Sequence, residues 1–233
     1  MVKLLTEQEE GHGLICEWNT RRGCSGELSM NNLDESLVKK VLSEAENKMI
    51  SDTATLMNCI LQKCDTENRN GRFYPRELLI REDKNYQELI REGRGLGEAN
   101  HPDSSNIDIT NVSHRVIKSW WEGNTLLGVL EIMTSRAYHE SGIICCTADK
   151  IADLLRKGVK LGISSRGVGS LKSVSGRNTV QDDFELICYD LVASPSTPGA
   201  FLYPDSEIKL NESTNIKIIN NPLINKLDDF LNL

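Results

Sequence analysis

The alternation of apolar and polar residues divides the chain into a body and two ends. The first 32 residues mix charges, glycines and isolated apolar residues without a sustained period, which predicts a loosely packed leader. Apolar residues at helical spacing over 34–49 predict an amphipathic helix. The C-terminal residues are polar at first, and 222–233 then predict a short apolar helix. We therefore expect a leader with its helix over 1–50, a body over 51–204 and a tail over 205–233.

Strand and helix signals alternate within the body. The expected strands are 53–64, 112–121, 125–133, 160–165, 168–174 and 184–193, and the expected helices are 76–93 and 148–157. The strands 112–121 and 125–133 flank a short glycine turn and predict a β-hairpin. Pro195, Pro198 and Pro204 are expected to end the regular structure. The pattern predicts an α+β body that is rich in strands, with helices on its outside.

The composition is that of a globular protein. Of the 233 residues, 39% are hydrophobic and 26% are charged, which is too apolar for wholesale disorder. The net charge of −7 argues against an extended basic surface, so we expect no nucleic acid partner. The sequence has no apolar run long enough to span a membrane and no signal peptide core, so we expect a cytoplasmic protein without a membrane partner. The seven cysteines include no CxxC pair and predict reduced, packed thiols.

Three segments carry side chains that can act together in catalysis. Pro102 biases His101 toward an extended backbone, which presents the imidazole from a fixed edge, although an ordinary turn histidine is the alternative. Ser164 and Ser165 stand among small residues, either as a nucleophile site or as a glycine-rich strand end. Asp190 lies within an apolar strand, where its carboxylate needs a partner, either the histidine or a structural arginine. A serine nucleophile needs a base, and the base needs an acid to orient it.

Metal and nucleotide chemistry are not indicated by the sequence. No HExxH motif occurs, and no carboxylate cluster has the ligand spacing of a calcium or zinc site. The glycine-containing segment 167–170 is too short for a phosphate loop and lacks the following lysine. We therefore expect no metal and no cofactor.

Five motifs follow one another between about 55 and 204. They are Asn68–Pro75 (Asn-Arg-Asn-Gly-Arg-Phe-Tyr-Pro), Glu98–Pro102, Trp120–Trp121 with Gly123–Asn124, Gly162–Gly167 with Gly169–Leu171, and Asp190–Val192 with Pro195, Ser196 and Pro198. In this order and spacing the chain resembles the prohead core proteases of T-even-type tailed phages. One such motif is weak, whereas five in series are specific.

The resemblance implies a serine endopeptidase with a fold similar to that of herpesvirus assemblin, a strongly curved, barrel-like β-structure ringed by helices. Carried over by motif, His101 is the general base, Ser164 is the nucleophile, and Asp190 is the orienting acid, where assemblin uses a second histidine. The family implies a zymogen inside the assembling prohead, in the host cytoplasm, which cleaves scaffold, core and capsid proteins. Cleavage is expected after Glu in a hydrophobic-x-Glu context, with self-processing that removes the leader. Homo-oligomer formation stays open.

Two other interpretations compete with this one. The alternative is a non-catalytic prohead core or scaffold protein that keeps a protease-like fold, although all three motif positions are filled here. An α/β-hydrolase is disfavoured because no Gly-x-Ser-x-Gly elbow occurs and because the order along the chain is His, Ser, Asp.

Finer predictions concern the surroundings of the site. Ser165 should face away from His101, and Asp190 should share a strand face with Cys188, because neighbouring side chains on a strand alternate. Arg166 or backbone amides of 195–199 are candidates for the oxyanion hole. The expected self-processing sites outside the body follow Glu7, Glu35, Glu44 and Glu212. Glu98 also fits the hydrophobic-x-Glu rule, but a cut there, beside His101, would inactivate the enzyme and limit its lifetime.

Overall fold

The structure is a computed structural model, and it describes residues 3–5, 10–17 and 42–204. The strands are β1 (Gly11–Cys16), β2 (Thr55–Lys63), β3 (Arg72–Phe73), β4 (Leu96–Glu98), β5 (Val112–Glu122), β6 (Thr125–Ile132), β7 (Gly162–Val174), β8 (Arg177–Val180), β9 (Glu185–Val192) and β10 (Leu202–Pro204). The helices are α2 (Glu44–Met49), α3 (Arg76–Arg91), α4 (Arg136–Ser141) and α5 (Thr147–Arg156). This confirms the α+β class.

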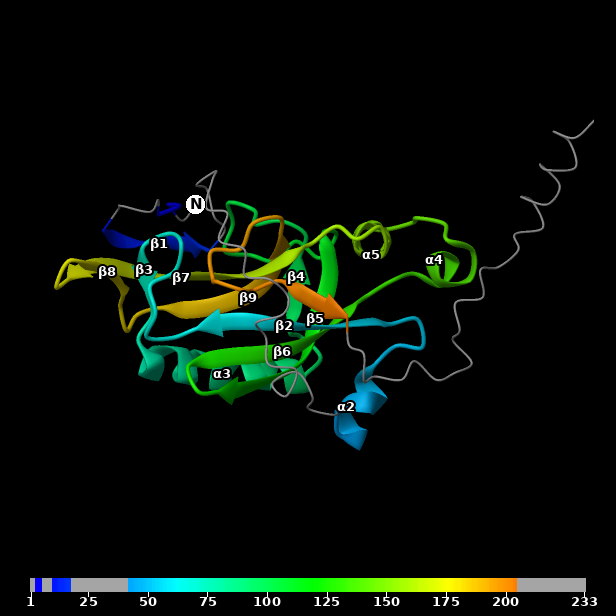
Figure 1. Cartoon of the computed structure of the whole chain (residues 1–233), viewed down its shortest axis with the longest axis horizontal. Helices are drawn as coiled ribbons and strands as arrows, with labels where there is room; N and C mark the ends of the chain where they lie inside the picture. Colours follow the sequence, from blue (N-terminus) through cyan, green and yellow to red (C-terminus); the bar gives the residue numbers. More distant parts are fainter. Residues whose placement is uncertain (1–2, 6–9, 18–41, 205–233) are drawn as a thin grey trace, which may run out of the picture.

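The strands form two five-stranded sheets. In the first sheet β7 is central, and it pairs antiparallel with β1, β8 and β9. Residues 166–168 of β7 pair with both β1 and β9, so these two strands flank β7 on opposite edges. The second sheet has the order β10–β2–β6–β5–β4, and all its neighbours are antiparallel. Figure 1 shows the two sheets as successive layers, with α3 along the outside of the second.

The two sheets meet at both edges of the second sheet. Beside β4, Ala99 forms an isolated bridge with Leu191, and beside β10, Phe201 forms one with Gly162. The edge strands β4 and β10 are only three residues long, so each junction consists of a few backbone hydrogen bonds. The described residues therefore form two joined sheets and no closed barrel with continuous ladders.

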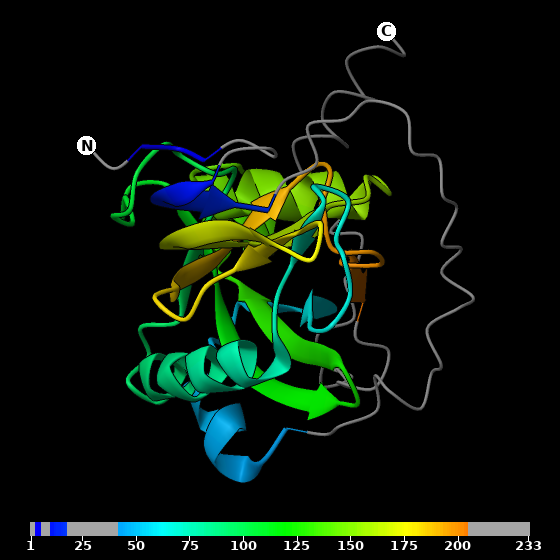
Figure 2. The same cartoon turned by 90° about the vertical axis from the view of Figure 1, so that its left-hand side faces the viewer.

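The main hydrophobic core contains residues from both sheets and from the helices. Leu130 and Ile132 of β6 and Ile163 of β7 are fully buried in this core. The amphipathic helix α3 contributes Tyr86 and Ile90 from its buried face. Figure 2 shows α3 lying against the second sheet and α5 on the other side of the molecule. Burial of apolar area on this scale is the main contribution to the stability of the fold.

The structure departs from the sequence predictions at the N-terminal segment. Residues 11–17 were expected in a loose leader, but β1 is fully paired with β7, and Leu14 and Ile15 are buried. Only α2 of the expected helix over 34–49 is described, and the tail helix lies outside the described residues. Whether a short segment forms a strand depends more on its pairing partner than on its own propensity. The glycines on either side of His12 weaken the strand signal of this segment in the sequence.

A second departure concerns the strands around the two serines. The expected break between 160–165 and 168–174 is absent, because β7 runs without interruption over 13 residues. Gly167 and Gly169 are needed for close packing, since a Cβ on Gly167 would lie 2.4 Å from the ring of Phe184. The short elements β4, β8, β10 and α4 were not predicted. The hairpin β5–β6, the strands β2 and β9, and the helices α3 and α5 are confirmed.

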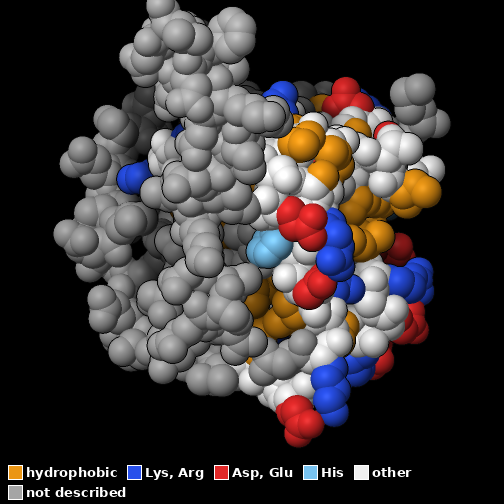
Figure 3. Space-filling model, turned by 90° about the vertical axis from the view of Figure 1, so that its right-hand side faces the viewer, with side chains coloured by type: hydrophobic (Ala, Val, Ile, Leu, Met, Phe, Trp, Pro, Cys, Tyr) orange, Lys and Arg blue, Asp and Glu red, His pale blue; other side chains and the backbone are white. Residues whose placement is uncertain are grey.

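The end of the molecule that carries α4 and α5 presents hydrophobic side chains to its surface (Figure 3). Met133, Ile143, Ile144 and Val159 are exposed large hydrophobic residues. Within the described ranges, no helix has both the length and the hydropathy required to cross a bilayer.

Candidate functional site

The structure brings together the three residues that the sequence singled out. Nδ1 of His101 lies 2.7 Å from Oδ2 of Asp190, and its Nε2 lies 2.8 Å from Oγ of Ser164. Ser164 and Asp190 are direct partners in the β7–β9 register, and His101 follows β4 of the other sheet. All three side chains are buried. The site therefore lies at the junction of the two sheets.

Backbone conformation at the junction positions the imidazole. Asn100 has a φ of +68°, and its N–H donates to the Leu191 carbonyl at 2.7 Å. A Cβ on Gly97 would lie 2.1 Å from the Tyr189 carbonyl oxygen, so only glycine allows β4 to approach β9 this closely. This close approach explains why a glycine precedes the Glu98–Pro102 motif.

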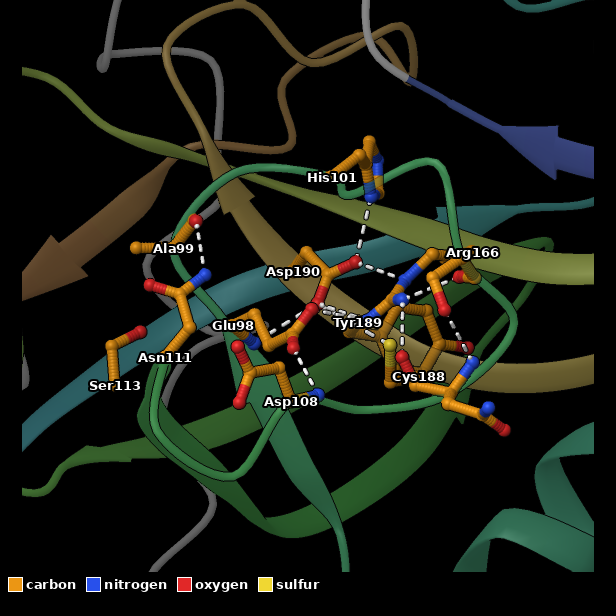
Figure 4. A network of polar contacts seen from close by, with 12 residues as sticks. Glu98, Ala99, His101, Asp108, Asn111, Ser113, Arg166, Cys188, Tyr189 and Asp190 are labelled. Carbon is orange, nitrogen blue, oxygen red and sulfur yellow. Dashed lines mark hydrogen bonds and ion pairs between the residues drawn. The ribbon is translucent and has the colours of Figure 1, made fainter. Parts of the chain in front are cut away.

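Asp190 is held by donors on several sides, as Figure 4 shows. Its Oδ2 accepts from Nε of Arg166 at 2.8 Å, and its Oδ1 accepts from the Glu98 N–H at 2.9 Å and from the Cys188 thiol at 3.3 Å. Burial alone would raise the pKa of Asp190, but the hydrogen bond and charge of His101 and the charge of Arg166 hold it below its usual value. The carboxylate stays ionised and accepts from Nδ1–H, so that Nε2 is the acceptor for the Ser164 hydroxyl.

Arg166 connects the acid to a second buried carboxylate. Its Nη2 lies 2.8 Å from Oε2 of Glu98 (Figure 4). Its Nη1 donates to the Ser104 carbonyl at 2.7 Å. Glu98 also accepts from the Asp108 N–H, yet burial raises its pKa above the usual value. The Arg166 side chain is thus fully engaged, so the suggestion that it serves the oxyanion hole is wrong for its guanidinium. Asp190 has both of the partners that the sequence left open, the histidine and a structural arginine.

Ser165 lies on the opposite face of β7. Its side chain bonds Tyr74, away from His101 and Asp190. Cys188 lies on the Asp190 side of β9, as strand alternation predicts. These two placements agree with the sequence expectations for the faces of both strands.

A second buried polar cluster, which we call the Glu17 pocket, was not predicted. Glu17 directly follows β1, and 1% of its surface is exposed. Its carboxylate accepts hydrogen bonds from five side chains: Asn68, Asn70, Arg72, Tyr74 and Ser196. Four of these donors belong to the motif Asn68–Pro75. The sequence feature that could have predicted this cluster is the high number of hydrogen-bond donors within the motif Asn68–Pro75.

An acid, a histidine and a serine in one hydrogen-bonded series define the class of serine hydrolases. A family model described as "Prohead core protein serine protease" matches residues 14–214, which is most of the chain. The chain therefore belongs to the prohead core protein serine protease family. Across the part of the chain that the structure describes, no group of His, Cys, Asp and Glu side chains is suited to hold a metal ion.

Two comparisons agree with this family. The "Prohead core protein protease" of Enterobacteria phage T4 is 34% identical over 148 residues, which are 62% of this chain and 66%, just under two thirds, of the relative. The solved structure of the bacteriophage T4 capsid assembly protease matches with a TM-score of 0.54 and 29% identity, over 60% of this chain and 82% of that one. The fold is thus similar to that of a capsid assembly protease.

Proposed function

We propose that this protein is a serine endopeptidase of phage head maturation, with Ser164 as nucleophile, His101 as general base and Asp190 as orienting acid. The observation that carries the proposal is the unbroken series of hydrogen bonds, at 2.7 and 2.8 Å, from Asp190 through His101 to Ser164. The family and the names of the T4 relatives support the same activity.

The mechanism follows from the roles of these three groups. Ser164 Oγ attacks the carbonyl carbon of the scissile bond while its proton passes to Nε2 of His101. Asp190 stabilises the imidazolium, which then donates that proton to the leaving amine as the C–N bond breaks. A water molecule then attacks the acyl carbon while its proton passes to His101. The bond to Ser164 Oγ breaks, and His101 returns the proton to this oxygen, which regenerates Ser164.

The proposed substrates are scaffold, core and capsid proteins inside the assembling prohead, cut after Glu in a hydrophobic-x-Glu context. The printed names of the T4 relatives, a prohead core protease and a capsid assembly protease, support these partners and this location. We also propose kinship with the curved barrel of assemblin. This proposal is supported by the isolated bridges that join both edges of the second sheet to the first.

Self-processing is proposed at exposed sites. Glu44 is exposed at the start of α2, so cleavage after it stays a prediction. Glu98 is fully buried and bonded to Arg166, so we expect no cut there in the folded protein. Glu7, Glu35 and Glu212 lie outside the described residues.

A paired substitution tests the activity. The purified chain is incubated with a capsid or scaffold precursor beside Ser164→Ala and Ser165→Ala. We expect Ser164→Ala to lower the cleavage rate by about 10⁶-fold, as loss of a triad nucleophile does, and Ser165→Ala to keep most activity. A dead Ser165→Ala beside an active Ser164→Ala reverses the assignment. If the parent itself does not cleave, the alternative of a non-catalytic core or scaffold protein is favoured.

A further inference from the structure

The Glu17 pocket lies beside the strand that carries Ser164. We propose that this pocket recognises the glutamate before a cleaved bond, and that the chain's own Glu17 occupies it as a substrate residue would. This inference rests on the proposed protease function, since it assigns specificity and self-inhibition to the same site.

The backbone of β1 lies along β7 as an extended peptide added to a sheet edge. Cys16 pairs with Arg166, and the Glu17 N–H donates to the Ser165 carbonyl at 3.1 Å. The strands are antiparallel, so each step toward the carboxyl side of β1 is a step toward Ser164 on β7. By this register the carboxyl side of Glu17 is directed toward the proposed nucleophile.

The Glu17 carbonyl oxygen accepts from the Ser196 N–H at 2.9 Å. An oxyanion-hole donor lies at 2.7–3.1 Å from the oxygen on which charge develops. When Ser164 Oγ adds to the carbonyl carbon of a substrate glutamate in this position, its proton moves to His101, and the carbonyl electrons move onto this oxygen. The Ser196 N–H stabilises that charge until the C–N bond breaks and the amine takes the proton. Ser196 lies in the loop 195–199 that the sequence favoured for this role.

The side chain of Glu17 is recognised as a carboxylate of this length. Oε1 accepts from the Tyr74 hydroxyl at 2.6 Å and from Arg72 at 3.2 Å, and Oε2 accepts from the Ser196 hydroxyl at 2.9 Å and from Asn68 and Asn70 at 2.6 and 3.2 Å. Burial and the Glu17 charge raise the pKa of Tyr74 well above its usual value, so its hydroxyl stays a donor. Glutamine would set an NH₂ group against donors, and aspartate would be one methylene too short.

The turn that carries Asn68 has hydrogen bonds of its own. Oδ1 of Asn68 accepts from the backbone N–H groups of Asn70 and Arg72 at 2.9 and 3.0 Å, which fixes the turn. The Arg69 N–H donates to the Ser196 carbonyl at 3.0 Å, which joins the turn to the loop after β9. A pocket organised in this way can exchange one glutamate for another.

The test measures hydrolysis of two fluorogenic peptides by the full chain. Both carry Gly-Leu-Ile-Cys before the last residue, which is Glu in one and Ala in the other, followed by an aminocoumarin amide. Tyr74→Phe removes one hydroxyl donor and keeps the ring against Phe184. We expect the ratio of kcat/KM for the Glu peptide over the Ala peptide to fall about tenfold or more, because a hydrogen bond to a charged group is lost. An unchanged ratio overturns the proposal, whatever happens to the absolute rates.

A second variant tests occupancy by the chain itself. Glu17→Ala should raise kcat/KM for the Glu peptide several-fold, because the internal competitor is removed. Glu10→Ala, in the same segment and exposed, should leave it unchanged. A folded Glu17→Ala protein with equal or lower activity overturns self-occupancy; if that variant does not fold, the Tyr74→Phe ratio alone decides. Should the parent hydrolyse neither peptide, or Ser164→Ala match it, the protease function itself fails. Ser164-dependent hydrolysis with no change of ratio removes only the pocket assignment.

Discussion

Asp190 and Glu17 are both buried carboxylates with one arginine each, yet they are held in different ways. Asp190 and Arg166 stand on adjacent strands of one sheet, and that arginine also binds Glu98. Glu17 comes in on β1, and its donors come from a turn and a loop with their own hydrogen bonds. Breaking the Asp190–Arg166 pair leaves an uncompensated buried charge, so this pair is expected to stay in place. Under the proposal above, the Glu17–Arg72 pair separates when a substrate glutamate takes the place of Glu17.

The largest expected effect is on catalysis at the fixed carboxylate. Asp190→Asn should lower kcat for a peptide ending in Glu by about 10⁴-fold, because the imidazole loses the acid that sets its tautomer. Glu185→Gln on the same strand should stay close to the parent, since Glu185 is exposed. Steady-state kinetics with matched unfolding curves measures both. An active Asp190→Asn beside a dead Glu185→Gln would move the orienting role to the other face of β9.

The two arginines provide the next test of the comparison. Arg166→Lys should lower the free energy of unfolding by about 3–5 kcal/mol, because two buried carboxylates lose their shared guanidinium. Arg72→Lys should lower it by only about 1–2 kcal/mol, since the segment that carries Glu17 can undock from its pocket. Denaturant titrations of the two variants give both values. Equal losses would mean that the Glu17 pocket is as fixed as the Asp190 site.

The last test concerns pH near the fixed site. Burial lowers the pKa of His114 to about 4, and its Nε2–H donates to the Tyr189 carbonyl at 2.9 Å. Below a pH of about 6.5 the unfolded chain takes up the proton first, so stability is lost as the pH falls toward about 4. The slope should approach about 1.4 kcal/mol per pH unit. His114→Gln should flatten the curve in this window, and an equally steep curve for that variant would contradict the prediction.

The sequence predicted the longer strands and helices of the body and the three proposed catalytic residues, because apolar periodicity and short motifs carry that information. It did not predict that Arg166 and Glu98 surround Asp190, since this contact arises only where β4 of one sheet approaches β9 of the other. The Glu17 pocket was missed for a related reason. Its acid lies in a glycine-rich segment that resembles a loose leader, and its donors lie some 50 to 180 residues further along the chain.

Because the site lies at the junction of the two sheets, it is complete only when both sheets have folded and joined. His101 depends on the edge of one sheet, whereas Ser164 and Asp190 belong to the other. A chain in which either sheet has formed alone holds the base or the nucleophile with its acid, never all three. The proposed hydrolytic activity therefore requires both sheets to be formed and joined, and a copy with only one sheet in place is expected to be inactive.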